Sequence, residues 1–311
     1  MNIPATIENE RDIQGLSYES HLLAHCGEEI HLQRIFTQPN GPVVLMLHGS
    51  LGNSRVFYSE NGKGLAPYLA RQGYDVYCLD LRGRGKSRPR IDRSSEYGQT
   101  ESIVEEIPLA LRYLQEFRGN TEIRCCAHSW GGVLFLSTFI RFPDLAKKVR
   151  GAVFFGSKRV IHRNTFLKRF ALTPVWDGLG RLLVHFKGYL SGKWIRFGDD
   201  CETKKSYFQT AAWLWGKPWV DSEDGFDYRQ RLGDMPHFPC LFLTGTHDWV
   251  AGAADDIKAF ISECGDRTET QLRVLGRKTG FSRDYGHLDI LIHPQAQTEV
   301  FPLVLEALQG S

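Results

Sequence analysis

The sequence of 311 residues lacks several features that would assign it to a simple class of protein. It has no uninterrupted apolar run of the roughly 18 residues that a transmembrane helix needs. It has no large excess of one charge, since 38 Lys and Arg residues oppose 36 Asp and Glu residues, which leaves a net charge of +2. This balance gives no reason to expect a nucleic-acid partner. The N-terminal stretch also lacks the basic and apolar regions of a secretory signal.

The sequence is equally poor in patterns for disulfides and metals. It has seven cysteines, an odd number, with no CxxC pair and no Cys/His spacing that suggests zinc. Cys125 and Cys126 are adjacent in an apolar run, which is typical of buried, reduced thiols. We therefore expect a cytoplasmic protein that uses neither a metal nor a cofactor.

The sequence does contain a regular alternation of strand and helix patterns. Short continuous apolar runs are typical of strands that are buried on both faces of a parallel sheet. Strands that alternate with amphipathic helices predict an α/β fold, with a mostly parallel sheet and helices on both faces. The expected strands are 43–47, 74–81, 123–127, 149–155, 240–244 and 270–275, after a hairpin of 16–26 and 29–38, and the expected helices are 65–71, 100–117, 132–141 and 288–308, the last interrupted near Pro294.

One segment, residues 158–236, interrupts this alternation. Its 79 residues are too many for a simple loop, so we expect an inserted, mainly helical lobe that divides a core of residues 1–157 and 237–311. It holds five of the seven tryptophans, and its first half, 158–196, has nine basic residues and one acidic residue. This basic half is either a solvated surface or an entrance that attracts anionic amphiphiles.

A serine follows the strand at 123–127 in a pattern typical of a nucleophile. The chain runs through AHSWG (127–131) directly into a helix, with Ala127 where this motif usually has glycine. A strand–turn–helix context of this kind exposes the Ser129 hydroxyl on a strained turn, and small flanking residues let the two backbones pass closely. The alternative is an ordinary glycine-rich turn with a chance serine.

The acid and the base that would activate this serine are expected after later strands. Asp248 follows the strand at 240–244, and His287 precedes the last helix. We expect His287 to take the proton of Ser129 and return it to the leaving group, while Asp248 holds the imidazole and stabilises the imidazolium. The weaker candidates for these two roles are His247, Asp255, Asp256, Asp284 and His293.

A tetrahedral intermediate also needs two backbone N–H donors for its negative charge. The expected donors are the N–H of Trp130, directly after the serine, and that of Ser50, in the loop after the first parallel strand. His48 is expected to bond within its own loop. The basic loop 82–86 lacks the spacing of a phosphate-binding P-loop, so we interpret it as structural.

Five motifs in this order and spacing resemble the α/β-hydrolase fold, with a cap inserted after the sixth strand. The resemblance covers residues 13–308 and implies a serine hydrolase that cleaves a carboxylic ester with an apolar acyl part through Ser129, His287 and Asp248. The five motifs are HGSLGN (48–53), CLDLRGRGKS (78–87), AHSWGG (127–132), GTHD (245–248) and GHLD (286–289).

The resemblance leaves several alternatives for the substrate, because this fold hosts many reactions. Epoxide hydrolases and dehalogenases of the fold carry an aspartate in place of Ser129, so acyl transfer is favoured. An acyl thioesterase would use the same residues. Trp130 resembles the elbow of proline iminopeptidases, but the basic first half of the insertion has the wrong charge for a free amino terminus. A non-catalytic binding protein is the remaining alternative. The expected partner is a small ester or thioester, anionic amphiphiles included, and the sequence predicts no oligomeric state.

Overall fold

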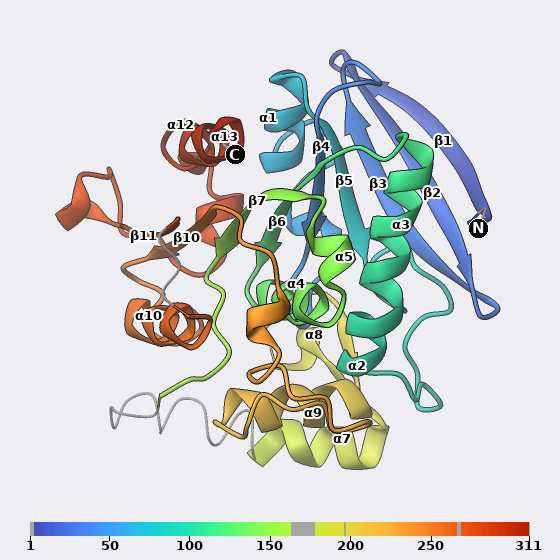
Figure 1. Cartoon of the computed structure of the whole chain (residues 1–311), viewed down its shortest axis with the longest axis vertical. Helices are drawn as coiled ribbons and strands as arrows, with labels where there is room; N and C mark the ends of the chain where they lie inside the picture. Colours follow the sequence, from blue (N-terminus) through green and yellow to red (C-terminus); the bar gives the residue numbers. More distant parts are fainter. Residues whose placement is uncertain (1–2, 163–177, 196, 266–268, 311) are drawn as a thin grey trace.

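The computed structural model describes residues 3–162, 178–195, 197–265 and 269–310. Its centre is a nine-stranded sheet in the order β1-β2-β3-β5-β4-β6-β7-β10-β11 (Figure 1). The six strands from β5 to β11 are parallel, and β3, β2 and β1 extend the sheet in antiparallel fashion. The bounds are β1 (Ala5–Ile13), β2 (Leu16–His25), β3 (Glu28–Phe36), β4 (Val43–Leu47), β5 (Asp75–Asp80), β6 (Ile123–His128), β7 (Val149–Phe155), β10 (Cys240–Gly245) and β11 (Thr270–Leu275).

The predicted hairpin and all six predicted parallel strands are confirmed, whereas β1 was missed. β1 (ATIENERDI) pairs with β2 at the edge of the sheet, and most of its described residues are not buried. An edge strand with little apolar burial has no clear period-2 pattern, which explains the omission. Because of β1, the insertion follows the seventh strand of the chain, β7, and not the sixth.

The four predicted helices agree with the structure except where prolines divide them, and α5 (Pro143–Ala146) was not predicted. The helix expected at 100–117 consists of a short helix, a π-helical turn and α3, which has Pro108 in its first turn. A proline there removes one N–H from the helical hydrogen-bond ladder. The last helix is divided at Pro294 and again before Pro302. The bounds are α1 (Leu65–Arg71), α2 (Gln99–Glu101), η2 (Ser102–Glu106), α3 (Ile107–Phe117), α4 (Trp130–Arg141), α5 (Pro143–Ala146), α10 (Ala254–Glu263), α11 (Asp289–Ile292), α12 (Ala296–Glu299) and α13 (Phe301–Gln309).

The two faces of the sheet bury separate hydrophobic clusters. On one face Leu45 and Leu47 of β4 pack with residues of α3, α4 and α10. On the other face Val44 and Met46 pack with residues of α1 and α13. Burying a large apolar side chain contributes about 1.5–3 kcal/mol. The continuous apolar run of β4 is therefore explained, because consecutive residues serve opposite clusters.

The inserted segment forms a lobe at one end of the sheet (Figure 1). Backbone bonds join it to the loop after β4, since Asp200 N donates to Leu51 O at 3.0 Å. It thus lies over the carboxyl ends of the central strands. Its small antiparallel sheet was not predicted, and residues 163–177 and 196 of its basic first half, which include Lys168, Arg169 and Trp176, lie outside the described residues. The elements are α7 (Arg181–Lys187), β8 (Tyr189–Ser191), α8 (Gly192–Ile195), β9 (Cys201–Thr203) and α9 (Lys204–Leu214).

Candidate active site

Ser129 lies in the turn between β6 and α4 with a backbone conformation that is rare for a non-glycine residue. Its φ is 52° and its ψ is −122°, and its N–H donates to Phe155 O at 2.7 Å. A side chain in this region costs about 1–3 kcal/mol, which the surrounding structure must offset. The flanking positions are correspondingly tight. A Cβ on Gly131 would lie 2.5 Å from His48 O, and a Cβ on Gly49 would lie 2.8 Å from the Ser129 Cβ.

Asp248 and His287 form a close pair beside this turn. His287 Nδ1 lies 2.5 Å from Asp248 Oδ2, and Asp248 Oδ1 accepts the N–H of Gly252 at 2.7 Å. Because an ionised carboxylate only accepts hydrogen bonds, this contact favours the neutral tautomer of His287 that has its proton on Nδ1 and its lone pair on Nε2. Gly156, with φ of 60°, makes room for the imidazole, since a Cβ there would lie 2.8 Å from His287 Cε1.

The residue before the serine connects the two parts of the site. The ring of His128 lies with its centroid 4.6 Å from that of His287, and His128 Nε2 is 3.2 Å from His287 O. Ser129, His287 and Asp248 are therefore neighbours at the carboxyl ends of the parallel strands. Within the described residues no hydrogen bond joins Ser129 to His287. Such bonds are often long in unliganded enzymes and shorten when substrate binds.

The rival acids are occupied elsewhere, Asp255 by Lys258 Nζ at 3.4 Å. Asp284 Oδ1 accepts from Thr246 Oγ1 at 2.8 Å and from Arg277 N at 2.9 Å. The Arg277 N–H, followed by the Thr246 hydroxyl, holds the pKa of Asp284 below its ordinary value. Asp256 Oδ1 accepts the backbone N–H of His162 at 3.0 Å. The structure therefore pairs His287 with Asp248.

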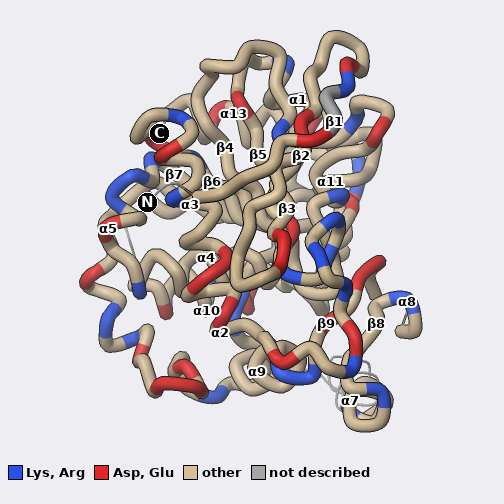
Figure 2. The backbone as a smooth tube through the Cα atoms, turned by 90° about the vertical axis from the view of Figure 1, so that its right-hand side faces the viewer, with Lys and Arg blue, Asp and Glu red and all other residues tan. Residues whose placement is uncertain are grey.

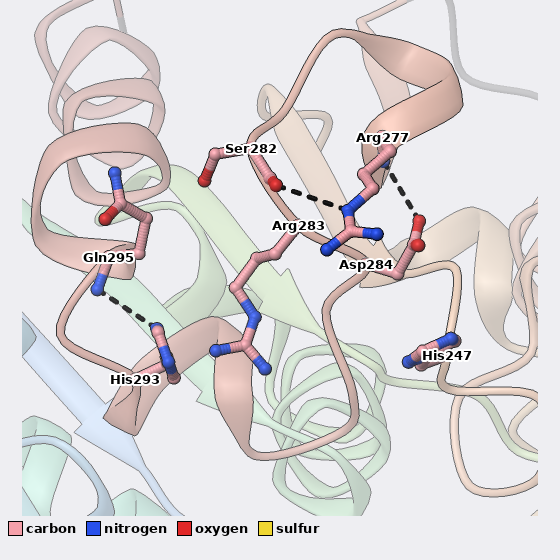
Figure 3. A pocket seen from close by; sticks show the side chains of 7 residues that line it. All are labelled: His247, Arg277, Ser282, Arg283, Asp284, His293 and Gln295. Carbon is pink, nitrogen blue, oxygen red and sulfur yellow. Dashed lines mark hydrogen bonds between the residues drawn. The ribbon is translucent and has the colours of Figure 1, made fainter.

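Asp284 and two rival histidines line a separate hollow of about 380 Å³. Figure 3 shows this hollow, in which Asp284 bonds to the backbone of Arg277. Two arginines line it: Arg277 Nε donates to Ser282 O at 3.4 Å, and the Arg283 guanidinium pairs with Asp289 at 3.2 Å. The lining residues are His247, Arg277, Ser282, Arg283, Asp284, His293 and Gln295.

The two expected oxyanion donors lie on the loop after β4 and at the start of α4, which pack against each other. Trp130 is the first residue of α4, so its N–H is among those that a helix leaves unpaired at its positive end. Ser50 lies in the loop that passes the Ser129 Cβ through Gly49. In the part of the chain that the structure describes, neither N–H donates to another protein group.

The buried groups around the site are held in their neutral forms. Burial, followed by the charge of His287, lowers the pKa of His128 well below its ordinary value. Burial likewise lowers the pKa of His48, whose Nδ1 lies 2.8 Å from Gly49 O. Burial raises the pKa of Cys125 and Cys126. These thiols are thus poor nucleophiles, because the thiolate is the reactive form.

The cations of the basic loop all bind internal groups. Arg82 pairs with Glu28 and Glu105 at 2.8 Å each. Arg84 pairs with Glu202 at 2.5 Å, and Lys86 Nζ donates to Gln33 Oε1 at 3.0 Å. Glu202 belongs to β9 of the inserted segment and had no signal in the sequence. The two arginines are thus neutralised by carboxylates, whereas Lys86 is exposed and bonds a neutral amide oxygen.

Two features are absent from the residues that the structure describes. No helix there is both long and apolar enough to span a membrane. The same residues contain no group of three or more His, Cys, Asp and Glu side chains that could hold a metal ion.

Comparison with known proteins gives partial sequence matches and long structural matches. The family model of the alpha/beta hydrolase fold matches residues 42–182. "Lipase member K" of Homo sapiens is 28% identical over 127 residues, which make up 39% of this chain and 31% of that protein. The chain thus aligns with less than a third of this relative's length.

Two solved structures resemble nearly the whole chain. A thioesterase domain from the curacin biosynthetic pathway has a TM-score of 0.58 and 18% identity, covering 93% of this chain and 99% of its own. A thermophilic esterase from Thermogutta terrifontis has a TM-score of 0.57 and 16% identity, and the match covers 97% of this chain and 99% of the esterase. At these identities the likeness concerns the fold.

Proposed function

We propose that this chain, which has the α/β-hydrolase fold, is a serine hydrolase that cleaves a carboxylic ester through an acyl-enzyme on Ser129. The observation that carries the proposal is the 2.5 Å contact between Asp248 and His287 beside a serine held at φ of 52°. A strained serine next to an oriented imidazole is the arrangement that acyl transfer requires.

The reaction proceeds in two steps. Ser129 Oγ attacks the ester carbonyl while His287 Nε2 takes its proton, and the resulting oxyanion accepts the N–H groups of Ser50 and Trp130. The carbon–oxygen bond to the alcohol then breaks, and His287 protonates the leaving alkoxide. A water molecule next attacks the Ser129 ester, with His287 again as base, which releases the acid and restores the serine. Asp248 stabilises the imidazolium in both steps.

The proposed division of the chain assigns catalysis to residues 1–157 and 237–311, and substrate entry to a cap of residues 158–236. The described part of the cap supports an apolar acyl group with an anionic head. Leu182 and Phe186 are 55% and 65% exposed on α7. Basic residues lie beside them, and no acidic residue occurs in 178–195 (Figure 2). Some of the expected positive charge is compensated, since Arg159 is buried and pairs with Glu263 at 2.5 Å.

The seven cysteines support a cytoplasmic location within this proposal. All of them are free thiols, although two are not buried. Free thiols persist in a reducing compartment and tend to oxidise in a secretory one.

Labelling with a fluorophosphonate probe tests the proposed function. Wild type should be labelled at one site, Ser129→Ala should not, and a known serine hydrolase serves as the positive control. Wild type that stays unlabelled while the control reacts would refute the proposal. A panel of p-nitrophenyl esters from acetyl to palmitoyl then determines the acyl length.

An acyl thioesterase is the second candidate, because the thioesterase domain named above has the same fold over nearly all of this chain. Oxygen and thiol esters of the same acid separate the two. A kcat/KM at least about tenfold higher for the thiol ester, beyond its intrinsic reactivity with hydroxide, would favour the thioesterase.

A further inference from the structure

The loop that carries the oxyanion donor Ser50 is held in place from the inserted segment. Leu51, the next residue, has a left-handed backbone with φ of 56° and a fully buried side chain. Its N–H donates to Glu202 Oε1 at 2.9 Å, and its C=O accepts from Asp200 N at 3.0 Å. Both polar groups of its backbone are therefore bonded to the same short segment.

The side chain of Leu51 is also enclosed by the inserted segment. It forms a small hydrophobic cluster with Val184, Leu190 and Tyr207, all of which belong to that segment. Gly198 passes so closely that a Cβ there would lie 2.2 Å from Leu51 O. A leucine rarely adopts a left-handed conformation unless its surroundings impose it. Here those surroundings come largely from the insertion.

Glu202 is itself rigidly fixed. It is 2% exposed, and its Oε2 lies 2.5 Å from Arg84 Nη2 and 2.5 Å from Ser206 Oγ. Asp200 holds the neighbouring loops in the same way, because its Oδ2 accepts from Gly85 N at 2.7 Å and from Asn53 Nδ2 at 3.1 Å. The two carboxylates thus link the insertion to the loops after β4 and β5.

We propose that Glu202 and Asp200 are positioning residues that set the direction of the Ser50 N–H. The C=O of Ser50 and the N–H of Leu51 belong to one peptide plane, so the bond from Leu51 N to Glu202 fixes that plane. The plane in turn restricts the rotation of Ser50, whose loop lies against Ser129 through Gly49. Transition-state stabilisation by this donor then depends on the docked insertion. The inference rests on the proposed function.

The simplest variant, Glu202→Ala, would leave Arg84 buried without its partner and could unfold the protein. Two double variants avoid that problem. Arg84→Met/Glu202→Met removes the ion pair and the acceptor of the Leu51 N–H. Arg84→Met/Glu202→Gln removes the same ion pair but retains an oxygen that can accept that N–H. A comparison of the two double variants therefore measures the effect of the acceptor of the Leu51 N–H alone.

Three quantities are measured on both double variants: kcat, KM, and Ki for an alkylboronic acid, which forms an anionic tetrahedral adduct with the serine. Loss of one oxyanion donor lowers kcat on the order of 10²–10³-fold. We expect Met/Met to lose about 10²-fold in kcat at nearly constant KM, with Ki raised by a similar factor. The kcat and the Ki of Met/Gln should both stay within about tenfold of the wild-type values.

The control is Glu263→Gln, which weakens the ion pair with Arg159, another link between insertion and core. It should lower the melting temperature and leave kcat and Ki unchanged. A folded Met/Met variant with the kcat and Ki of Met/Gln would overturn the inference while the hydrolase assignment stands. A wild type that is unlabelled by fluorophosphonate and inactive on every ester refutes both.

Discussion

Asp248→Asn is expected to disable the candidate site, for a reason that follows from its two hydrogen bonds. The carboxylate accepts one bond on each oxygen, from His287 Nδ1 at 2.5 Å and from Gly252 N at 2.7 Å. An asparagine has one oxygen and one NH₂ group, so one of these donors must face another donor. If the oxygen faces Gly252, His287 adopts the other tautomer and Nε2 can no longer accept the proton of Ser129.

The size of the effect follows from this choice of tautomer. In the reference serine triad the same substitution lowers kcat on the order of 10⁴-fold, which corresponds to about 5.5 kcal/mol of transition-state stabilisation. The side chain of Asp248 is almost fully buried, so water cannot replace the lost acceptor. We therefore expect a loss of about 10³–10⁴-fold in kcat, with KM changing much less.

The assay is initial-rate hydrolysis of a short p-nitrophenyl ester, together with circular dichroism to verify the fold. Asp284→Asn is the matched control, because this acid also follows a strand and accepts two hydrogen bonds, but from Thr246 and Arg277. It should retain kcat within about threefold of wild type. The assignment is wrong if Asp248→Asn turns over at near the wild-type rate while Asp284→Asn does not.

Three further predictions follow from the glycines, the basic helix and the buried histidines. Gly156→Ala places a methyl group 2.8 Å from the imidazole of the candidate base, so kcat should fall at least about tenfold, whereas Gly119→Ala, with a similar φ but nothing within 4 Å, should affect stability alone. The kcat/KM of an anionic ester should fall as salt rises from about 0.02 to 0.2 M while that of a neutral ester stays level, and Arg181→Glu/Lys187→Glu should abolish the difference; equal salt responses in wild type would contradict it. Burial lowers the pKa of His128 in the folded state, so below about pH 6.5 this histidine is protonated in the unfolded chain alone. The free energy of unfolding should therefore decrease as the pH is lowered, by up to about 1.4 kcal/mol for each pH unit. Urea unfolding at pH 7.5 and 5.5 should show a smaller decrease for His128→Asn than for wild type.

The core of the fold could be predicted because its signals are local. Val43–Leu47 is apolar without alternation since its residues serve two clusters on opposite faces, and this pattern appears in any window of the sequence. β1 has no such signal because it lies at the exposed edge of the sheet. The small β8–β9 sheet was also missed, since strands of three residues are too short for a period to be recognised.

The candidate triad could be located because its members follow the ends of parallel strands, and those ends meet at one edge of the sheet. The sequence favoured Asp248 over Asp284 by its position relative to a strand, but the contacts that separate them are tertiary. Asp284 bonds to Thr246, 38 residues away, and Asp248 bonds to His287, 39 residues away. Separations that are so nearly equal do not by themselves favour Asp248 over Asp284 as the partner of His287.

The role proposed for Glu202 could not be predicted from the sequence. Its partner Leu51 is 151 residues away, and Arg84 is 118 residues away. In the sequence, a single glutamate before a helix predicts a solvated surface charge. Burying a carboxylate without partners costs free energy, so a buried carboxylate needs partners. Its partners here are a backbone N–H, a guanidinium and a hydroxyl from three separate segments. Only the docking of the insertion on the loops after β4 and β5 creates that environment, so the residue proposed to position the Ser50 loop lies outside every motif recognised in the sequence.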